Sequence, residues 1–208
     1  MKIYNISRLI KKDMLVYKNK ESKRPTLCPV ATHKENHMHE SELHMNLHTG
    51  THIDAPLHMI DGAETIDEMD LSLYMGAAKV LDLTKCEDQI YVKDVEKYEI
   101  NEGDIILLKT KNSFHMGDDY DPNFVFISVE LAEYLRKKGI KTVGLDAPSI
   151  ERGQEGHPTH KIILGAGIGV IEDLRLAEVP EGTYTLQSLP LFISQAEASP
   201  VRAILIEE

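Results

Sequence analysis

Residues 48–58 hold the densest group of metal-type ligands in the chain, His48-Thr49-Gly50-Thr51-His52-Ile53-Asp54-Ala55-Pro56-Leu57-His58. Three imidazoles and one carboxylate lie within these eleven residues, and both side-chain types bind divalent transition metals. A helix would bring His48 and His52 onto one face, as in helical zinc sites, but Gly50 and Pro56 disfavour a helix interior. We therefore expect an extended segment here.

An extended segment must bend if its histidines are to share one ion. In an extended chain the side chains of residues 48, 52, 54 and 58 point to the same side, but the Cα atoms of His48 and His52 would lie about 13 Å apart. Both histidine nitrogens have to approach a shared zinc to roughly 2.0–2.1 Å. Gly50 can take the positive φ that such a bend needs, and Pro56 stiffens the chain on its way to His58.

The residues of this run predict two roles. His48, His52 and Asp54 are candidate metal ligands, and His58 is the candidate catalytic residue, left free for proton transfer. The alternative is that these are ordinary surface or core histidines, because a chain with ten histidines brings some together by chance. Four acceptor side chains in one register around a glycine and a proline favour the metal hypothesis.

The same run matches the pattern HxGTHxDxPxH without a mismatch. This pattern is the signature of the cyclase-type metal-dependent hydrolases, a family that includes bacterial kynurenine formamidase, and the chain resembles that family. The resemblance spans almost the whole chain, because further matching segments follow the signature: Asp61-Gly62, Ile66-Asp67, Gly144-Leu145-Asp146-Ala147-Pro148-Ser149, His160-Lys161-Ile162-Ile163-Leu164-Gly165, Ile171-Glu172 and Ser199-Pro200-Val201-Arg202.

The resemblance implies a centre of two zinc ions, with manganese as an alternative metal. Family members hold two zinc ions, and the positions that match their remaining ligands are His160 and Glu172. In the implied arrangement His48, His52 and Asp54 bind one ion. Asp54 and Glu172 bridge the two ions, and His160 binds the second. The residues alone give no reason to choose His160 and Glu172 over other distant side chains.

The resemblance also implies hydrolysis of an amide C–N bond in a small molecule, with arylformamides as the leading substrates. A metal-bound hydroxide would attack the carbonyl, because bound water can ionise near neutral pH. His58 would then give the leaving amine its proton. The alternatives are a cyclic amide (isatin-like) or lactone hydrolase, and a metal-binding protein without catalysis. The presence of His58, which a metal store does not need, argues against the last.

Composition alone predicts only a mixed α/β fold class. The resemblance implies the swivelling β/β/α fold, a barrel-like mixed sheet flanked by helices, as a single domain over residues 1–208. It also implies a homo-oligomer, a dimer or a tetramer. In formamidases of this family a tryptophan of the N-terminal loop contacts the substrate ring. This chain has no tryptophan, so Tyr17 is the candidate substrate residue in its place and the particular substrate stays open.

The composition excludes several other classes of protein. With 208 residues and 42% hydrophobic side chains, the chain resembles an ordinary globular protein that is long enough to bury a core. Its net charge of −11 disfavours nucleic acid and anionic membrane as partners, and the short basic segment at residues 18–24 is most simply a solvated face. Cys28 and Cys86 are expected to be reduced thiols.

We also expect a cytoplasmic protein. No apolar run approaches the roughly 18 residues that are needed to cross a bilayer. The opening sequence MKIYNISRLIKKD lacks the long apolar centre and the cleavage site of a signal peptide.

Patterning predicts several strands and helices. Ser128 as N-cap and Gly139 as C-cap bound a helix that ends in cations, and Pro158 to Leu164 predicts a shorter helix with His160 in its first turn. Residues 95–98 are a third helical candidate, and residues 18–29 and 110–123 are expected to be loops. Apolar runs and alternation predict strands at residues 3–6, 14–17, 43–47, 79–83, 104–109, 140–145, 169–171 and 202–206.

The roles of His33, His37, His39, His44 and His115 stay open. His33, His37 and His39 lie in a polar stretch, where we favour a loop over a second metal site because no carboxylate or turn chemistry fixes their geometry. His44 lies in the predicted strand at residues 43–47, which alternation makes half-buried. By parity it faces the same side as His48, so it either supports the ligands or lies on the strand surface. His115 lies in the predicted long loop.

Overall fold

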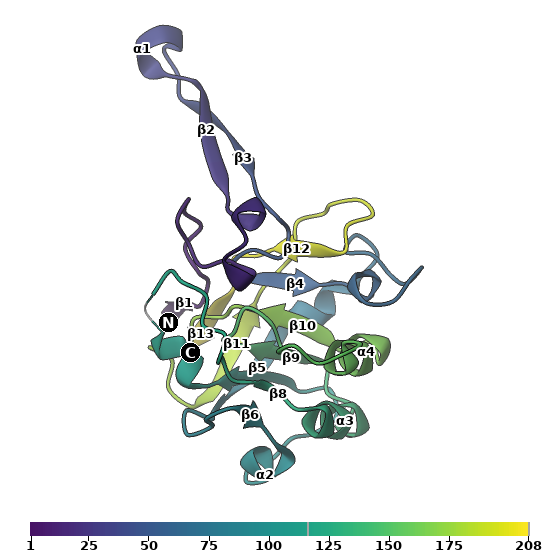
Figure 1. The fold of residues 1–208 in the computed structure, drawn as a ribbon. Helices are drawn as coiled ribbons and strands as arrows, with labels where there is room; N and C mark the ends of the chain where they lie inside the picture. Colours follow the sequence, from purple (N-terminus) through teal and green to yellow (C-terminus); the bar gives the residue numbers. More distant parts are fainter. Residues whose placement is uncertain (116, 208) are drawn as a thin grey trace.

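A curled nine-stranded sheet forms the centre of the computed structural model, which describes residues 1–115 and 117–207 (Figure 1). Its strand order is β1-β13-β11-β5-β7-β9-β10-β4-β12. In chain order these strands are β1 (Lys2–Asn5), β4 (His52–Asp54), β5 (Met75–Asp82), β7 (Ile105–Lys109), β9 (Thr142–Leu145), β10 (Gly169–Glu172), β11 (Gly182–Gln187), β12 (Ala198–Pro200) and β13 (Ile204–Glu207).

The four middle strands β5, β7, β9 and β10 run parallel, and the strands on either side pair antiparallel. Strand β7 has the sequence IILLK and is buried at every residue, as expected for a parallel strand that is covered on both faces. The predicted class, a mixed barrel-like sheet flanked by helices, is confirmed. The strands predicted at residues 79–83, 104–109, 140–145 and 169–171 are the four middle strands.

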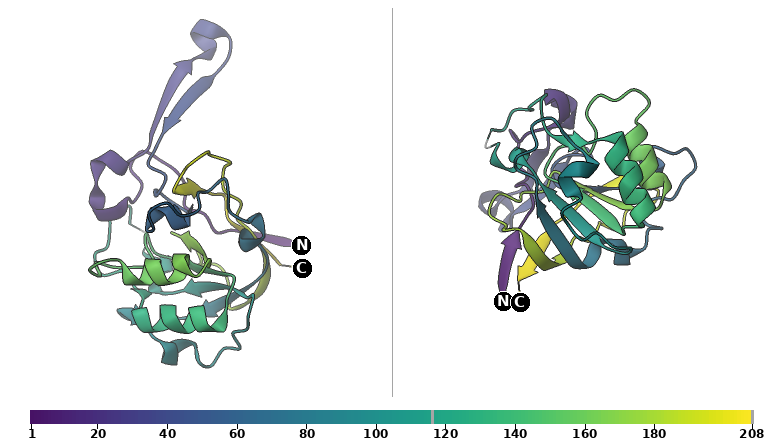
Figure 2. Two further views of the ribbon diagram at one scale, coloured as in Figure 1. Left: turned by 90° about the vertical axis from the view of Figure 1, so that its right-hand side faces the viewer. Right: turned by 90° about the horizontal axis from the view of Figure 1, so that it is seen from below.

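Helices α3 (Val129–Lys138) and α4 (Pro158–Gly165) lie side by side on one face of the sheet (Figure 2). The side chain of Ser128 accepts a hydrogen bond from the backbone N–H of Leu131, and Gly139 takes a φ of 67° after the last turn. Both predicted helices are confirmed. Helix α2 (Val92–Val95) begins earlier than the predicted segment 95–98, because the carboxylate of Asp94 caps its first turn.

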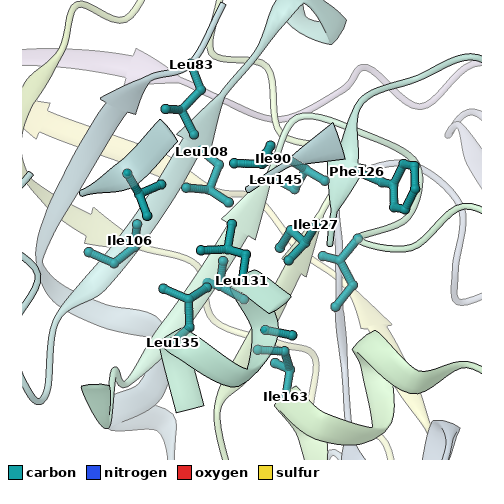
Figure 3. Close-up of a cluster of buried hydrophobic side chains, with 14 of the residues drawn as sticks. Leu83, Ile90, Ile106, Leu108, Phe126, Ile127, Leu131, Leu135, Leu145 and Ile163 are labelled. Carbon is teal, nitrogen blue, oxygen red and sulfur yellow. The ribbon is translucent and has the colours of Figure 1, made fainter. Parts of the chain in front are cut away.

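The core consists of two clusters of buried side chains, one on each face of the sheet. Strand β7 contributes to both, because alternate side chains point to opposite faces: Ile106 and Leu108 face the helices, and Ile105 and Leu107 face away. Figure 3 shows Ile106 and Leu108 packed with residues of α3 and α4 in the cluster on the helix side.

A hairpin made of β2 (Thr26–Ala31) and β3 (Glu40–His44), with the one-turn helix α1 (His33–Asn36) at its tip, projects from the body (Figure 1). We call residues 26–44 the arm. The loop predicted for residues 18–29 is therefore wrong in its last part. Pro29 is tolerated because a two-stranded ribbon leaves half of its backbone groups unpaired. The strand predicted at residues 43–47 lies earlier, and half-burial is wrong for residues 43 and 44 because every residue of β3 is exposed. Residues 45–47, after the strand, are partly buried.

The strand predicted at residues 14–17 is also wrong. Met14, Leu15 and Val16 are buried without pairing to a neighbouring strand. The carbonyl of Met14 accepts a hydrogen bond from the guanidinium of Arg24 at 2.8 Å, so a side chain satisfies the backbone here. The apolar run reflects packing beneath the turn at Gly50. A Cβ atom added at Gly50 would lie 3.1 Å from Cε of Met14.

The remaining elements are short. Strands β6 (Gln89–Ile90) and β8 (Phe126–Ile127) pair with each other apart from the main sheet. Within the described residues, no helix is both long and apolar enough to span a membrane. The described part of the chain also contains five 3₁₀ turns: η1 (Tyr17–Asn19), η2 (Glu21–Lys23), η3 (Pro56–His58), η4 (Leu71–Tyr74) and η5 (Lys111–Phe114).

Candidate metal centre

The candidate centre is built on the pairing of β4 with β10. Its antiparallel register places His52 directly opposite Glu172 and Ile53 opposite Ile171. Because side chains alternate along a strand, His52, Asp54 and Glu172 share one face, whereas Ile53 and Ile171 enter the core cluster on the other face. Directly opposite side chains are near neighbours, and His52 Nε2 lies 3.3 Å from Glu172 Oε2.

The turn before β4 supplies His48. Gly50 has a φ of 73°, so the chain bends where the ligand spacing predicted it. This bend brings His48 Nδ1 to 2.9 Å from Asp54 Oδ1. It also lets Nδ1 of His52 donate to the carbonyl of Gly50 at 2.8 Å. The second nitrogen of His52, Nε2, therefore faces the carboxylates, 3.4 Å from Asp54 Oδ1.

Helix α4 adds the fifth predicted ligand, His160. Pro158 begins the helix after His157, which takes a φ of 54°, and His160 follows in the first turn. His160 Nε2 lies 3.1 Å from Glu172 Oε1 and 3.7 Å from Asp54 Oδ2. All five residues that the sequence analysis proposed as metal ligands thus converge on one place. Their role as ligands stays a prediction.

The polar atoms at this place fit a divalent cation. Among the described residues, His52 Nε2 and both carboxylate oxygens of Asp54 are buried and make no hydrogen bond of good geometry, although imidazole nitrogens lie 2.9–3.4 Å from Asp54 Oδ1. Burying polar atoms that make no hydrogen bond costs free energy, and buried charges are normally paired or bound to metals. His52, Asp54 and Glu172 each offer one ligand atom within 4.8 Å of the others.

The ionisable groups of the cluster shift one another strongly. Burial alone would raise the pKa of Asp54, but the adjacent His48 and His52 hold this pKa well below its usual value. Burial alone would lower the pKa of His160, but contact with Glu151 and Glu172 raises it to about 10. For Glu172, burial and the charge of Asp54 are outweighed by His160 and His52, and its pKa falls to about 2. Protons thus stabilise this cluster where cations would otherwise do so.

His58, the predicted catalytic residue, lies beside the cluster. It ends turn η3, and its ring centroid is 4.0 Å from that of His48 and 6.0 Å from that of His160. Burial lowers the pKa of His58, which favours a neutral imidazole at pH 7. His48, Asp54 and His58 also offer ligand atoms within 4.8 Å of one another, so the geometry allows His58 either to bind a metal or to remain free.

Glu151 is a site residue that the sequence analysis missed. Its carboxylate is buried, accepts a hydrogen bond from the backbone N–H of His160 at 3.2 Å, and lies 3.4 Å from Nδ1 of the same histidine. The other oxygen lies 2.9 Å from Nδ1 of His157. Metal-binding histidines commonly donate their second ring N–H to a carboxylate. No periodicity links two residues nine positions apart across a loop, so only the folded chain shows this contact.

A pocket of about 450 Å³ opens above the cluster, lined by His48, His58, His160 and Glu172. Tyr17, the predicted substrate residue, lines its wall. The ring of Tyr17 packs edge-on against Tyr120 at 5.3 Å, so the loop predicted at residues 110–123 reaches this side of the pocket, with residue 116 outside the described part.

His157 belongs to a further group of ligand atoms with Glu151 and His160, whereas the five histidines whose roles were left open belong to none of the groups found among the described residues. His33 is in α1, and His37 and His39 lie in the same exposed tip of the arm. His44 is exposed on β3, which favours the strand-surface interpretation. His115 Nε2 contacts the carbonyl of Asp119 at 3.0 Å.

Fold and site together define a class: an α/β protein whose curled sheet carries a buried histidine and carboxylate cluster at the floor of an open pocket. The sequence pattern of the Cyclase family matches residues 4–152. The chain therefore belongs to the cyclase family, and the resemblance stated from the signature residues is confirmed.

Three known proteins illustrate the similarity. The chain is 34% identical to the kynurenine formamidase of Bacillus cytotoxicus over 163 residues, 77% of each chain. It is 44% identical to a solved structure described as a potential metal-dependent hydrolase with cyclase activity, with a TM-score of 0.89 over 98% of this chain and 96% of the other. Isatin hydrolase A from Labrenzia aggregata has the same fold, with a TM-score of 0.87 at 22% identity over 100% and 94% of the two chains.

Proposed function

We propose that this protein is a metal-dependent hydrolase that cleaves the amide C–N bond of a small molecule, with arylformamides as the leading substrates. One observation carries the proposal: buried ligand atoms of His52, Asp54 and Glu172 lie within 4.8 Å of one another at the floor of an open pocket. The similarity to a kynurenine formamidase and to a structure described as a potential metal-dependent hydrolase supports the same reaction class.

The proposal includes two divalent ions, zinc or manganese. The ligands would be His48, His52, Asp54, His160 and Glu172, and neutral imidazoles with carboxylates suit either metal. When bound, such ions polarise a carbonyl and make a nucleophile from water near neutral pH. Two carboxylates and three neutral imidazoles neutralise only part of the charge of two divalent ions, so an anion beside them is favoured.

The chain's own residues have separate tasks in this proposal. His52 is oriented by its hydrogen bond to the carbonyl of Gly50, and Glu151 holds the ring of His160 from behind. His58, neutral because burial lowers its pKa, accepts a proton and delivers it to the leaving amine. Tyr17 forms an aromatic wall for the substrate.

The test is an assay of purified, metal-loaded protein against formylkynurenine, simpler arylformamides, isatin and lactones. We expect hydrolysis of arylformamides, and loss of it in His52→Ala. Preference for isatin or a lactone would identify the cyclic-substrate alternative instead. Inertness toward every amide and lactone, with metal bound, would overturn the proposal in favour of a metal-binding protein without catalysis.

We also infer a homo-oligomer, a dimer or a tetramer, in which a second copy covers the arm. Leu27 and Leu43 face each other across β2 and β3, and both are exposed, by 68% and 52%. An isolated two-stranded hairpin is marginally stable in water, so the arm gains from a partner. Light scattering during size-exclusion chromatography measures the molar mass of the protein in solution and tests this inference. Leu27→Asp should reduce this mass relative to wild type, and a wild-type monomer would refute the inference.

A further inference from the structure

A buried hydroxyl connects the two chain segments that carry His52 and Glu172. Thr51 directly precedes His52, and Asp173 directly follows Glu172. The hydroxyl of Thr51 donates to the backbone carbonyl of Asp173 at 2.7 Å, and both residues are buried. Because His52 and Glu172 are the last paired residues of β4 and β10, this side-chain bond extends the pairing by one more residue.

Arg8 completes the connection from the N-terminal segment. Its Nε and Nη2 lie 2.6 and 2.7 Å from the two carboxylate oxygens of Asp173, and such a two-pronged contact fixes the relative orientation of both groups. The backbone N–H of Arg8 donates to the hydroxyl of Thr51 at 2.8 Å. One hydroxyl therefore accepts from Arg8 and donates to Asp173. We call Arg8, Thr51 and Asp173 the clamp.

The clamp holds an uncommon backbone conformation next to Glu172. Asp173 has a φ of 56°, in the left-handed region that few residues with a side chain adopt. Its backbone N–H donates to the carbonyl of Ala147 at 2.7 Å. The bonds to Arg8 and Thr51 hold the side chain and the carbonyl of the same residue. Every polar group of Asp173 is thus fixed, and with it the point at which the chain turns away after Glu172.

The N-terminal segment is attached to the same end of β10. Ser7 forms a bridge with Leu174, and the carbonyl of Ile6 accepts from the backbone N–H of Arg175 at 2.9 Å. The side chains of Arg8 and Asp173 are only 12% and 2% exposed. Losing one partner of a buried ion pair leaves the other charge uncompensated, which is strongly unfavourable. The backbone around Asp173 is then expected to rearrange.

We propose that the clamp positions His52 and Glu172 and so sets the affinity of the candidate centre for its metal. This assignment rests on the metal-dependent part of the proposed function and adds the residues that hold the ligands in place. Of the described residues that line the pocket above the cluster, none belongs to the clamp. Its members therefore bind neither the ion nor the substrate, and act only through the two ligands.

Electrostatics and positioning predict opposite effects for a change at Arg8. Arg8→Gln removes a positive charge near a cation site, which by Coulomb's law alone would raise the affinity for a metal ion. Loss of positioning lowers it, by roughly 10- to 100-fold for groups that orient metal ligands. We expect the lower affinity. Competition with a chromogenic chelator for Zn²⁺ measures it without turnover.

The hydroxyl of Thr51 allows a second test with a rescue. Thr51→Val removes both hydrogen bonds of the hydroxyl and keeps a branched side chain, and we expect the affinity for Zn²⁺ to fall by roughly tenfold or more. Thr51→Ser keeps the hydroxyl and should bind Zn²⁺ close to the wild-type level. Equal losses in the two variants would show that the methyl group, and not the hydroxyl, matters here.

A matched control separates positioning from a general loss of stability. Lys79→Gln makes the same change in charge and breaks the ion pair of Lys79 with Asp104 at 2.7 Å, and neither residue belongs to a group of ligand atoms. This variant should bind Zn²⁺ like the wild type. If Arg8→Gln does not fold, Arg8→Lys makes the comparison, because lysine keeps the charge but not the two-pronged contact, and its affinity should also fall.

The clamp and the hydrolase proposal fail in different ways. If arylformamides are cleaved but Arg8→Gln and Thr51→Val bind Zn²⁺ as tightly as the wild type, or more tightly, the clamp is wrong and the hydrolase stands. If the variants lose affinity for Zn²⁺ but the wild type cleaves no amide or lactone, the clamp stands and the hydrolase fails. A wild type that binds neither Zn²⁺ nor Mn²⁺ would overturn both.

Discussion

The orientation of the His52 ring links the local backbone to the candidate metal centre. Its Nδ1–H is committed to the carbonyl of Gly50, so the lone pair of Nε2 points at the carboxylates of Asp54 and Glu172. A lone pair that faces two carboxylates is repulsive unless a proton or a cation lies between them. A contact between residues 50 and 52 thus sets the orientation of a buried imidazole and which of its nitrogens faces the carboxylates.

Replacing His58 by alanine should separate turnover from metal binding. We expect His58→Ala to lose activity by roughly 10² to 10⁴, the usual contribution of a positioned acid or base, and to keep its metal content as measured by elemental analysis. His44→Ala, at an exposed position on β3, is the control. Loss of metal in proportion to activity would show that His58 is instead a ligand alongside His48 and Asp54.

Glu151 is expected to act by positioning His160. Glu151→Gln keeps the size of the side chain but weakens its hold on Nδ1 of His160, and we expect metal affinity to fall by roughly 10- to 100-fold. Competition with a chelator measures this directly, without turnover. Glu155→Gln, exposed in the same loop, should bind metal like the wild type, and equal affinity in both variants would refute the role of Glu151.

At the scale of elements, β4 is the decisive strand because two neighbours hold it in register. β10 places Glu172 opposite His52, and β12 pairs with the other edge of the strand. A shift by one residue would turn His52 and Asp54 into the apolar core and Ile53 into the pocket. Strand pairing therefore does the positioning that a rigid helix performs in other metal sites.

The bend at Gly50 is open to a stability test. Gly50→Ala forces a residue with a side chain into a φ of 73°, which costs roughly 1–2 kcal/mol, and adds a contact at 3.1 Å from Cε of Met14. Gly62→Ala has a similar φ of 69° with nothing within 4 Å of the added atom. In urea unfolding we expect the first variant to lose more stability than the second. Equal losses would show that the contact with Met14 is harmless.

The sequence predicted the elements whose signals are local. The caps of α3 and the apolar run of β7 needed no tertiary context. The strand prediction at residues 14–17 failed because burial under a turn and burial in a strand produce the same apolar run. The loop prediction failed around Pro29 because a strand in an isolated two-stranded ribbon tolerates proline.

At the candidate site too, only the residues that are close together in the sequence could be predicted from it. His48, His52 and Asp54 were proposed from their spacing, and the register of β4 explains why that spacing works. His160 and Glu172 came only from the family resemblance. Glu151 was missed because its contacts with His157 and His160 span a loop and follow no sequence periodicity. The functional roles of all these residues stay predictions.

At the scale of the whole molecule, pH should affect metal-free and metal-loaded protein in opposite ways. The folded pKa of His160, about 10, lies above its usual 6.5, so its stabilising effect is complete below pH 6.5 and is lost as the pH rises toward 10. Glu172, with its pKa lowered to about 2, contributes above its usual value and loses this contribution as the pH falls toward 2. Metal-free protein should therefore become less stable between pH 6.5 and pH 10.

Metal binding should reverse this dependence of stability on pH, because ligand imidazoles must be neutral and protons compete with the ion. Thermal unfolding of chelator-treated and metal-loaded protein from pH 6.5 to pH 9 measures both slopes. Parallel slopes in the two forms would mean that the ion does not bind at His160.

The order of strands around β4 has a consequence for biosynthesis. Residues 48–58 leave the ribosome well before β10 and β12, which flank β4 in the sheet. A nascent chain therefore displays three imidazoles and a carboxylate without the glutamate and helix that enclose them. We expect cofactor loading to follow the emergence of His160 and Glu172, and a cell short of the ion to accumulate finished but empty protein.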